Sequence, residues 1–328
     1  MLLLSQADMK KIFTMRDAIE AVKAAFQMVS EGTCEIPLRT AIQAPAYEGC
    51  FLFMPAYAPS LDCASLKVIN IFPQNIDRGI PSSPAQVLLI DGTTGVVSAI
   101  LDGTHVTRMR TGAASGAALE VLARKDARKG ALIGTGGQAA TQLEAMLAVR
   151  KLEQVMVYDQ NAQRCKAFVE EMRRELAGYG TEILAAATSD EAVEDADMII
   201  TVTPSSRPVF DGTKVKAGAT ISCVGSYQPH MQELDPAVLP RVSKIYFDCQ
   251  SAVLAEAGDL IIPLEQGLIS EKNFTGEIGD VLRGELAGRE NEEEIILFET
   301  VGVAAQDLVT AKRIVDRASE AGVGLRWG

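Results

Sequence analysis

Six residues from Gly134 to Ala139, with the sequence GTGGQA, constrain the fold of this chain more than any other feature. They follow the apolar run KGALI and precede QAATQLEAMLAV, which has the pattern of a helix, so they join a strand to a helix. In this GxGxxA pattern, Gly134 permits a tight turn, Gly136 lets a ligand approach the backbone, and Ala139 lets helix and strand pack closely. The helix that begins there offers N–H donors and positive partial charge to a phosphate. The residues predicted to bind a dinucleotide here are Gly134, Thr135, Gly136, Gly137, Gln138 and Ala139.

A second strand, VMVYD, ends in Asp159, twenty residues after Ala139. A carboxylate at this place accepts hydrogen bonds from the ribose hydroxyls and repels a 2′-phosphate. The next three residues are uncharged, and Arg164 is the first cation after Asp159. The sequence therefore favours NAD(H) as cofactor, with NADP(H) as the alternative.

Strands and helices alternate from about residue 129 to residue 247, which indicates a doubly wound parallel sheet. Such sheets bind ligands at the carboxyl ends of their strands. Two more loops lie at such ends, after MIITVT and after ATISCV. They add Thr203 and Pro204, and Gly225 and Ser226, to the predicted cofactor site, although both loops could also be simple strand-ending turns.

The segments before and after this region have a different sequence pattern. Short apolar runs with turn residues between them, over residues 36–101, predict a mostly antiparallel sheet. Residues 298–322 are predicted as a helix that carries the chain back to that sheet. The predicted fold is α/β: a Rossmann domain at 117–307, inserted in an α+β domain made of 1–116 and 308–328.

Three cations of that second domain occur among apolar or small residues: Arg39, Lys67 and Arg110. Lys67 lies inside an apolar strand, where a lysine is costly unless it is paired or functional. An arginine fork suits a carboxylate, and a lysine can donate to a substrate or transfer a proton. Each cation alone also fits an ordinary place at the surface or at the end of a strand.

Charge and composition exclude several function classes. The 31 basic and 43 acidic residues give a net charge of −12, which argues against a nucleic-acid or anionic-membrane surface. Two histidines and six scattered cysteines offer few ligands for zinc, so no metal site is predicted. The cysteines are interpreted as free thiols, and the sequence lacks a signal peptide and a long apolar span. We therefore expect a cytoplasmic protein.

Several segments in order along nearly the whole chain carry a family resemblance: SLKVIN, TRMRTGAASGAA, IGTGGQAATQLEAM, VGSYQPHMQELDP and VGVAAQDL. Together they resemble the ornithine cyclodeaminase/mu-crystallin family. The resemblance implies a substrate domain that also forms homodimers, around a central Rossmann domain. It implies that Arg39, Lys67 and Arg110 contact the substrate carboxylate or its reacting end, with Lys67 and Arg110 as the catalytic pair. It also places Val301 and Gly302 at a turn facing the nicotinamide.

Two residues depart from the family pattern. Tyr227 stands where cyclodeaminases of the family carry an aspartate, although Glu233 and Asp235 lie in the same loop. Glu299 stands where a lysine is expected. The resemblance therefore favours an NAD(P)H-dependent reductase of a cyclic imino acid in proline metabolism. Its expected substrate is Δ1-pyrroline-2-carboxylate, reduced to L-proline, with Δ1-piperideine-2-carboxylate, reduced to L-pipecolate, as a second. The alternatives are an alanine dehydrogenase-like enzyme, an ornithine cyclodeaminase and a non-catalytic crystallin-like binding protein.

Overall fold

The structure, a computed structural model, describes all residues from 1 to 328. The chain divides into two compact units: unit 1 is Met1–Arg110 with Gly302–Gly328, and unit 2 is Thr111–Val301. The sequence predicts both borders six residues later, at 116/117 and 307/308. The first border falls within helix α3 (Gly103–Leu122), whose small-residue pattern is continuous and marks no break. The mixed α/β class with a parallel dinucleotide-type sheet is confirmed.

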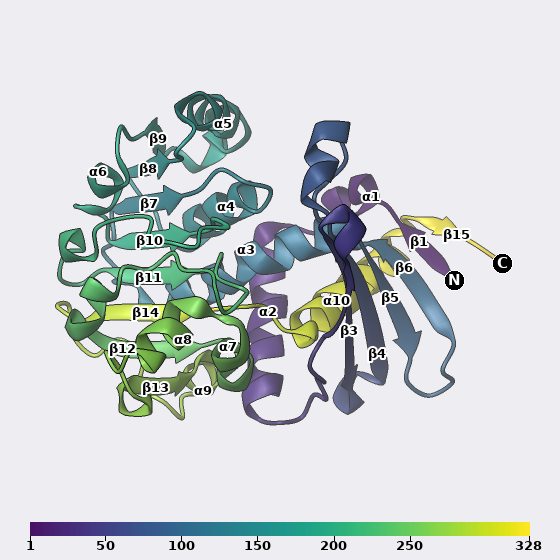
Figure 1. Cartoon of the computed structure of the whole chain (residues 1–328). Coiled ribbons are helices and arrows are strands. Elements are labelled where there is room, and N and C mark those ends of the chain that lie inside the picture. Colours follow the sequence, from purple (N-terminus) through teal and green to yellow (C-terminus); the bar gives the residue numbers. More distant parts are fainter. The chain divides into compact units, whose positions relative to one another are not determined.

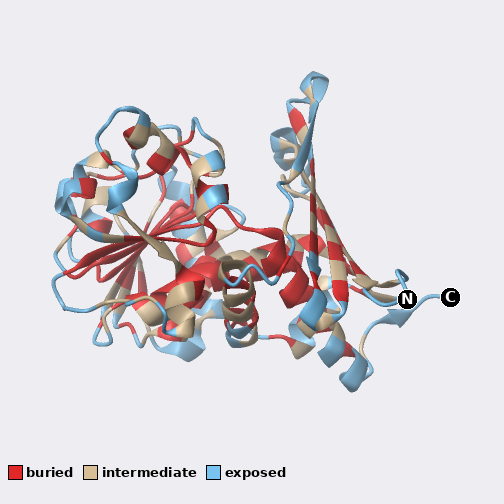
Figure 2. Ribbon diagram, turned by 90° about the horizontal axis from the view of Figure 1, so that it is seen from below, coloured by how far each residue is buried: buried red, intermediate tan, exposed pale blue.

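Unit 2 contains an eight-stranded sheet whose paired strands are all parallel. Its strand order is β13-β12-β14-β11-β10-β7-β8-β9, so the order reverses between β7 and β10. Figure 2 shows these strands as a largely buried layer. The strands are β7 (Lys129–Ile133), β8 (Gln154–Tyr158), β9 (Glu182–Ala185), β10 (Met198–Thr201), β11 (Thr220–Cys223), β12 (Val242–Phe247), β13 (Phe274–Glu277) and β14 (Ile295–Glu299). A doubly wound sheet binds ligands at such a reversal point.

The helices of unit 2 connect these strands (Figure 1). Helix α4 packs against β7, and α5 packs against β8 and β9. The helices that follow the strands are α4 (Ala139–Val149), α5 (Ala162–Glu175), α6 (Ser189–Val193), α7 (Gln250–Glu256), α8 (Gly258–Glu265) and α9 (Ile278–Arg283). The predicted alternation is present from β7 to β10 and after β12, whereas only short 3-10 turns lie between β10, β11 and β12.

Unit 1 contains a seven-stranded sheet with the order β15-β1-β6-β5-β4-β3-β2. Strands β2 to β6 are antiparallel neighbours, as the hairpin pattern predicts. Its strands are β1 (Leu2–Leu4), β2 (Thr40–Ala44), β3 (Gly49–Ala58), β4 (Cys63–Ile71), β5 (Ala85–Asp91), β6 (Val97–Asp102) and β15 (Leu325–Arg326). Strand β2 is an edge strand and is mostly exposed.

Three helices complete unit 1: α1 (Gln6–Ile12), α2 (Met15–Ser30) and α10 (Ala304–Ala321). Helix α2 begins with a capping box, in which Thr14 and Asp17 satisfy each other's backbone N–H groups. Helix α10 packs against α2 and across strands β3, β4 and β5. The prediction of one helix over 298–322 was wrong at its start, because Phe298 and Glu299 close strand β14. An apolar run such as IILF suits a buried strand as well as a helix.

Candidate active site

The glycine turn between β7 and α4 has the geometry that the motif predicts. Gly134 has φ +106°, and a Cβ there would overlap the Val202 carbonyl and the Thr203 side chain. A Cβ at Gly136 would meet nothing within 4 Å, so the backbone borders open space there. No side chain caps the start of α4, which leaves its first N–H groups for a phosphate. These observations fit a dinucleotide pyrophosphate.

Asp159 follows β8, and its carboxylate is already hydrogen bonded. One oxygen accepts from the Thr135 N–H at 3.0 Å and from its hydroxyl at 2.7 Å. The other accepts from the Asn161 N–H at 2.8 Å, and Arg164 donates to both oxygens at 2.7 Å. Burial opposes ionisation, but these hydrogen bonds hold the pKa of Asp159 below its usual value. Asp159 therefore presents a charge that Arg164 partly neutralises.

The two other predicted cofactor loops are joined by Glu233, which no local sequence pattern assigns to the cofactor site. Glu233, fully buried, accepts from the Thr203 N–H at 2.5 Å and from the Gly225 N–H at 2.6 Å. A Cβ at Gly225 would overlap the Thr203 carbonyl and this carboxylate, so the loop needs a glycine. The hydroxyl of Ser226 is buried and donates to the Met231 carbonyl, so it supports the loop from inside. Pro204 lies between Thr203 and Ser205 in an irregular segment.

Glu233 belongs to a buried acidic cluster that also contains Asp259 and Glu299. Burial and the charge of Asp259 raise the pKa of Glu233 to about 8. Burial raises the pKa of Asp259 to about 6, and burial with the neighbouring acids raises the pKa of Glu299 well above its usual value. Sequence reasoning missed the cluster because its members lie far apart along the chain, in a loop, a helix and a strand.

The three cations predicted to hold the substrate come together in unit 1. Lys67, on β4, has 0% of its surface exposed, and its ammonium contacts the Asp307 carboxylate at 2.5 Å. The Arg110 guanidinium, on α3, contacts the other oxygen of Asp307 at 3.1 Å. It also donates to the Gln306 side-chain carbonyl at 2.7 Å. Arg39, before β2, donates to the Gly302 carbonyl at 2.8 Å.

Gly302 links Arg39 to the rest of this cationic cluster, which we define as Arg39, Lys67, Arg110 and Asp307. It has φ +77°, and a Cβ there would overlap the Arg110 guanidinium. The predicted turn at Val301 and Gly302 thus places Gly302 beside the cations, and Val301 is buried at the end of unit 2. Lys67 and Arg110 share the one carboxylate of Asp307, so these buried groups carry excess positive charge when Lys67 is protonated.

Lys67 titrates near neutral pH in this setting. Burial and the positive charge of Arg110 lower the pKa of Lys67 to about 7, although Asp307 opposes the change. Asp307 was not identified from the sequence as a site residue. The signal was present in VGVAAQDL, where an aspartate interrupts the apolar face of a helix that buries one side.

The carboxylates that could replace the missing cyclodeaminase aspartate have other partners. Glu233 holds the two loops described above. Asp235 accepts from the Ala237 N–H at 3.0 Å and from the Gly212 N–H at 2.9 Å. Tyr227 is half-buried, and burial raises the pKa of its phenol, so it is a neutral group at pH 7.

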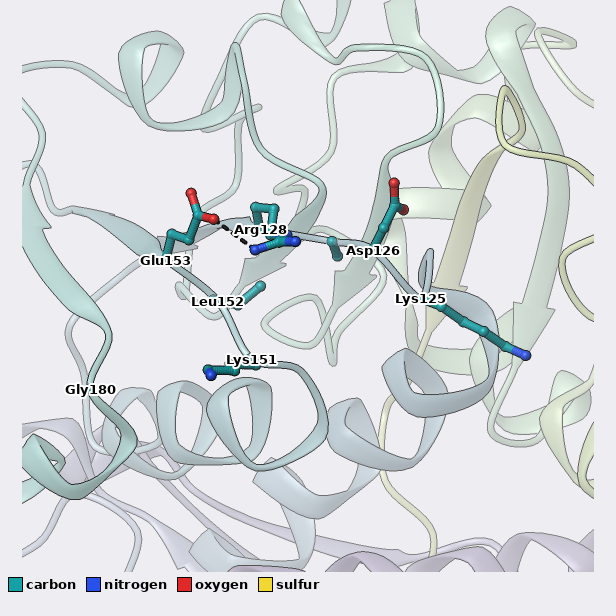
Figure 3. Close-up of a pocket in the computed structure, with 8 residues that line it drawn as sticks. Lys125, Asp126, Arg128, Lys151, Leu152, Glu153 and Gly180 are labelled. Carbon is teal, nitrogen blue, oxygen red and sulfur yellow. Dashed lines mark hydrogen bonds and ion pairs between the residues drawn. The ribbon is translucent and has the colours of Figure 1, made fainter.

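A pocket of about 500 Å³ lies elsewhere in unit 2 (Figure 3). Its lining includes Lys125, Arg128, Lys151 and Glu153. Arg128 donates to Glu153 at 2.7 Å, as Figure 3 shows. These residues precede or begin β7 and β8, whereas parallel sheets bind ligands at the carboxyl ends of their strands. None of the predicted site residues lines this pocket.

The model of the ornithine cyclodeaminase/mu-crystallin family matches residues 1–322. The chain belongs to this family. A Δ1-pyrroline-2-carboxylate reductase from Bacillus cereus is 36% identical over 326 residues, which cover 99% of each chain. The family resemblance inferred from the sequence motifs is thereby confirmed.

Solved structures of the family are also similar to this chain. The Δ1-pyrroline-2-carboxylate reductase of Thermococcus litoralis, in complex with NADH and L-proline, is 39% identical and superposes with a TM-score of 0.95, covering 100% of both chains. An archaeal alanine dehydrogenase dimer with bound NAD is 32% identical, with a TM-score of 0.91. This match covers 100% of the present chain and 98% of the dehydrogenase chain.

None of the helices has both the length and the apolar surface that crossing a membrane requires.

Proposed function

We propose that this member of the family is an NAD(P)H-dependent reductase of small cyclic imino acids. Its main substrate is Δ1-pyrroline-2-carboxylate, reduced to L-proline, and Δ1-piperideine-2-carboxylate is a second substrate. The observation that carries the proposal is the cationic cluster of unit 1, in which Lys67 and Arg110 share the single carboxylate of Asp307 and Arg39 donates to the neighbouring Gly302 carbonyl. Excess buried positive charge favours an anion, and the carboxylate of an imino acid supplies one.

Arg39 and Arg110 are the groups best suited to hold that carboxylate. Both are arginines, whose planar fork matches a carboxylate in two parallel hydrogen bonds. Asp307 and Gln306 accept from Arg110 and so fix the direction in which its remaining N–H groups point. Orientation of this kind can supply much of the rate enhancement when the reacting carbon must face a hydride donor.

Lys67 adds a charge that depends on pH. Its ammonium is held by Asp307 and is fully buried, so it acts on the substrate through the field of the cluster. While Nζ is protonated, the cluster attracts the carboxylate and polarises the conjugated C=N bond. A bound dihydronicotinamide supplies the hydride that adds to the C=N carbon, and the nitrogen keeps the proton that makes the imine electrophilic.

The cofactor is NAD(H) in preference to NADP(H). Asp159 supports this preference, because its carboxylate is bonded to Thr135 of the glycine turn, and a carboxylate at the end of this strand favours ribose hydroxyls and repels a 2′-phosphate. Arg164 supports some use of NADP(H), since its half-exposed guanidinium lies against the same carboxylate and could accompany a 2′-phosphate. The glycine turn and the N-terminus of α4 hold the pyrophosphate that the two cofactors share.

The chain forms a homodimer through unit 1. The edge strand β2 and its surroundings expose large apolar side chains, among them Leu38, Ile42 and Tyr47. An exposed edge strand with an apolar face is suited to pairing with a second chain. The similarity to an archaeal alanine dehydrogenase dimer supports this assembly. The six unpaired cysteines fit a reducing compartment, so we place the protein in the cytoplasm.

One assay tests the activity. The purified protein is given NADH or NADPH with a panel of cyclic imines, and with α-keto acids plus ammonia, and cofactor oxidation is followed. We expect the fastest turnover with Δ1-pyrroline-2-carboxylate and NADH, and L-proline as the product. Faster turnover with pyruvate and ammonia would instead make the chain an alanine dehydrogenase, as the similarity to the archaeal enzyme allows. Binding of the imine without turnover would identify a non-catalytic binding protein.

A further inference from the structure

The carboxylate of Glu299 has no hydrogen-bond partner although it is completely buried. Glu299 is the last residue of β14, its exposed fraction is 0%, and both of its carboxylate oxygens lack a donor. Asp259, in the first turn of α8, is equally buried. Its Oδ1 accepts from the Glu233 and Leu234 N–H groups, at 2.6 and 2.8 Å, whereas its Oδ2 has no partner. Three buried carboxylate oxygens are therefore without a donor.

No basic side chain compensates these oxygens. The charged groups that act on Glu299 are Asp259, Glu233 and Asp248, all of them acids. Burying a carboxylate without a partner costs far more than an exposed ion pair gains, so native structures pair such groups or coordinate a metal with them. These carboxylates therefore take up either protons or a bound cation, and the chain itself provides no cation beside them.

A thiol completes the surroundings of these oxygens. Cys223 is the last residue of β11 and lies directly opposite Glu299 in the register of the two parallel strands. The Cys223 sulfur and one carboxylate oxygen each of Asp259 and Glu299 all lie within 4.8 Å of one another. Small side-chain rotations bring ligand atoms at such separations onto one ion, whose bonds to sulfur and carboxylate oxygen measure about 2.3 and 2.1 Å.

We propose that Cys223, Asp259 and Glu299 bind one divalent transition-metal ion, with Zn²⁺ as the best-fitting member of that class. A sulfur ligand disfavours Mg²⁺ and Ca²⁺, which select oxygen, whereas zinc accepts sulfur and carboxylate oxygen together. All three ligands are buried, so the ion has a structural role, and one enclosed water molecule would complete its tetrahedral coordination. The site was not predicted from the sequence, since it uses neither a histidine nor a CxxC pair.

The ion would stabilise the two cofactor loops through Glu233. The Glu233 backbone N–H donates to Asp259, and the Glu233 side chain accepts from Thr203 and Gly225. A metal on Asp259 thus fixes the position of the residue that joins the loops after β10 and β11. This inference is independent of the substrate and stands whether or not the proposed reduction occurs.

Metal content tests the proposal. The full-length protein is measured by elemental mass spectrometry as purified, and again after chelator treatment and equilibrium dialysis against Zn²⁺ alone. We expect one Zn²⁺ per chain. Glu299→Gln and Cys223→Ser should each weaken Zn²⁺ binding at least tenfold. Cys165→Ser and Glu277→Gln are matched controls, because both alter a buried or half-buried residue of unit 2 outside the cluster and should bind normally.

Cobalt substitution gives a readout that needs no variant. Co²⁺ bound by the wild-type protein should show a sulfur-to-cobalt charge-transfer band from Cys223. Wild-type protein that binds no stoichiometric Zn²⁺ would overturn the proposal, and protons would then neutralise the acids. Stoichiometric Co²⁺ without the sulfur band would overturn it as well, as would Zn²⁺ binding that both variants retain.

Discussion

In unit 1 the buried Lys67 and Arg110 share the single carboxylate of Asp307, whereas in unit 2 the buried acids around Glu299 have no basic partner. In unit 1 every charged group of the cationic cluster still has a hydrogen-bond partner. In unit 2 Glu299 has none for either oxygen. The two interiors therefore suit different kinds of ligand. A cluster whose groups are all hydrogen bonded but carry excess charge is suited to a substrate that binds reversibly. A cluster with unpaired carboxylate oxygens is suited to a permanently bound ion.

The largest effect should follow from reducing the charge of unit 1. Replacing Arg110 with Met keeps most of the side-chain volume but removes a carboxylate partner. We expect transition-state stabilisation to fall by about 2–5 kcal/mol, the range for removing one member of a buried charge pair. The measurement is kcat/KM for Δ1-pyrroline-2-carboxylate, with NADH affinity measured in parallel and expected to change little.

Arg108→Met is the matched control for this variant. Arg108 lies on the same helix but is half-exposed and takes no part in the cluster. Its replacement should leave kcat/KM close to the wild-type value. If Arg110→Met also reduces the imine at a near-normal rate, the cationic cluster does not hold the substrate.

A smaller effect should appear when pH changes the charge of the same cluster. The Lys67 pKa is lowered to about 7, so the ammonium is present below this pH and is lost as pH rises through it. An anion binds the protonated form better, and its Kd should therefore rise above pH 7, by at most tenfold per pH unit for one coupled proton. Furan-2-carboxylate, which neither reacts nor titrates in this range, is a suitable probe for calorimetry.

Lys67→Met provides the control for the pH effect. This variant has no titrating group at position 67. Its Kd for the probe should be higher than that of the wild type and nearly constant from pH 6 to pH 9. A wild-type Kd that does not vary with pH would show that Lys67 does not couple to the bound carboxylate.

How far the sequence alone predicted these two regions depends on how each is assembled. Lys67 was identifiable because a lysine inside an apolar strand conflicts with its surroundings, and Gly134 because its motif is local. The acidic cluster has neither signal. It forms because β14 pairs between β11 and β12, which brings Glu299 beside Cys223. Strand order is a long-range property that local patterns do not contain.

The contrast between local patterns and long-range packing also explains two smaller differences between the predictions and the structure. Asp307 was missed because an aspartate in the first turn of a helix is usually a solvated residue that favours the helix dipole. The predicted domain borders lie six residues beyond those of the structure. Helix α3 runs across the first border without a cap, glycine turn or proline to mark it. Positions that depend on packing between distant segments were therefore the ones that sequence patterns did not predict.

Substitutions at the cofactor site should change the preference between NADH and NADPH by a smaller factor, because the ion pair between Asp159 and Arg164 is partly exposed. Arg164→Ala removes the cation that neutralises Asp159, and its side chain is 55% exposed. We expect NADPH to lose several-fold in kcat/KM relative to NADH, since the carboxylate then repels a 2′-phosphate without compensation. Asp159→Ser should shift the ratio the other way.

Arg173→Ala is a control on the same helix, because Arg173 donates to the Ile183 carbonyl and not to Asp159. Its ratio of NADPH to NADH use should stay at the wild-type value. A wild-type preference for NADPH of tenfold or more would contradict the assignment of Asp159 as the residue that favours NAD(H).

The last prediction is that no ammonia is released from ornithine. It tests whether any acid of unit 2 can act as the base that cyclodeamination needs. Converting ornithine to proline requires a carboxylate that holds and deprotonates the distal ammonium before ammonia leaves. Glu233 and Asp235 are engaged by backbone N–H groups, and Tyr227 has a phenol whose pKa is raised by burial. Incubation with L-ornithine and catalytic NAD should therefore release no ammonia. Ammonia release at a rate comparable to imine reduction would mean that one of these acids leaves its backbone partners, and would make the chain a cyclodeaminase.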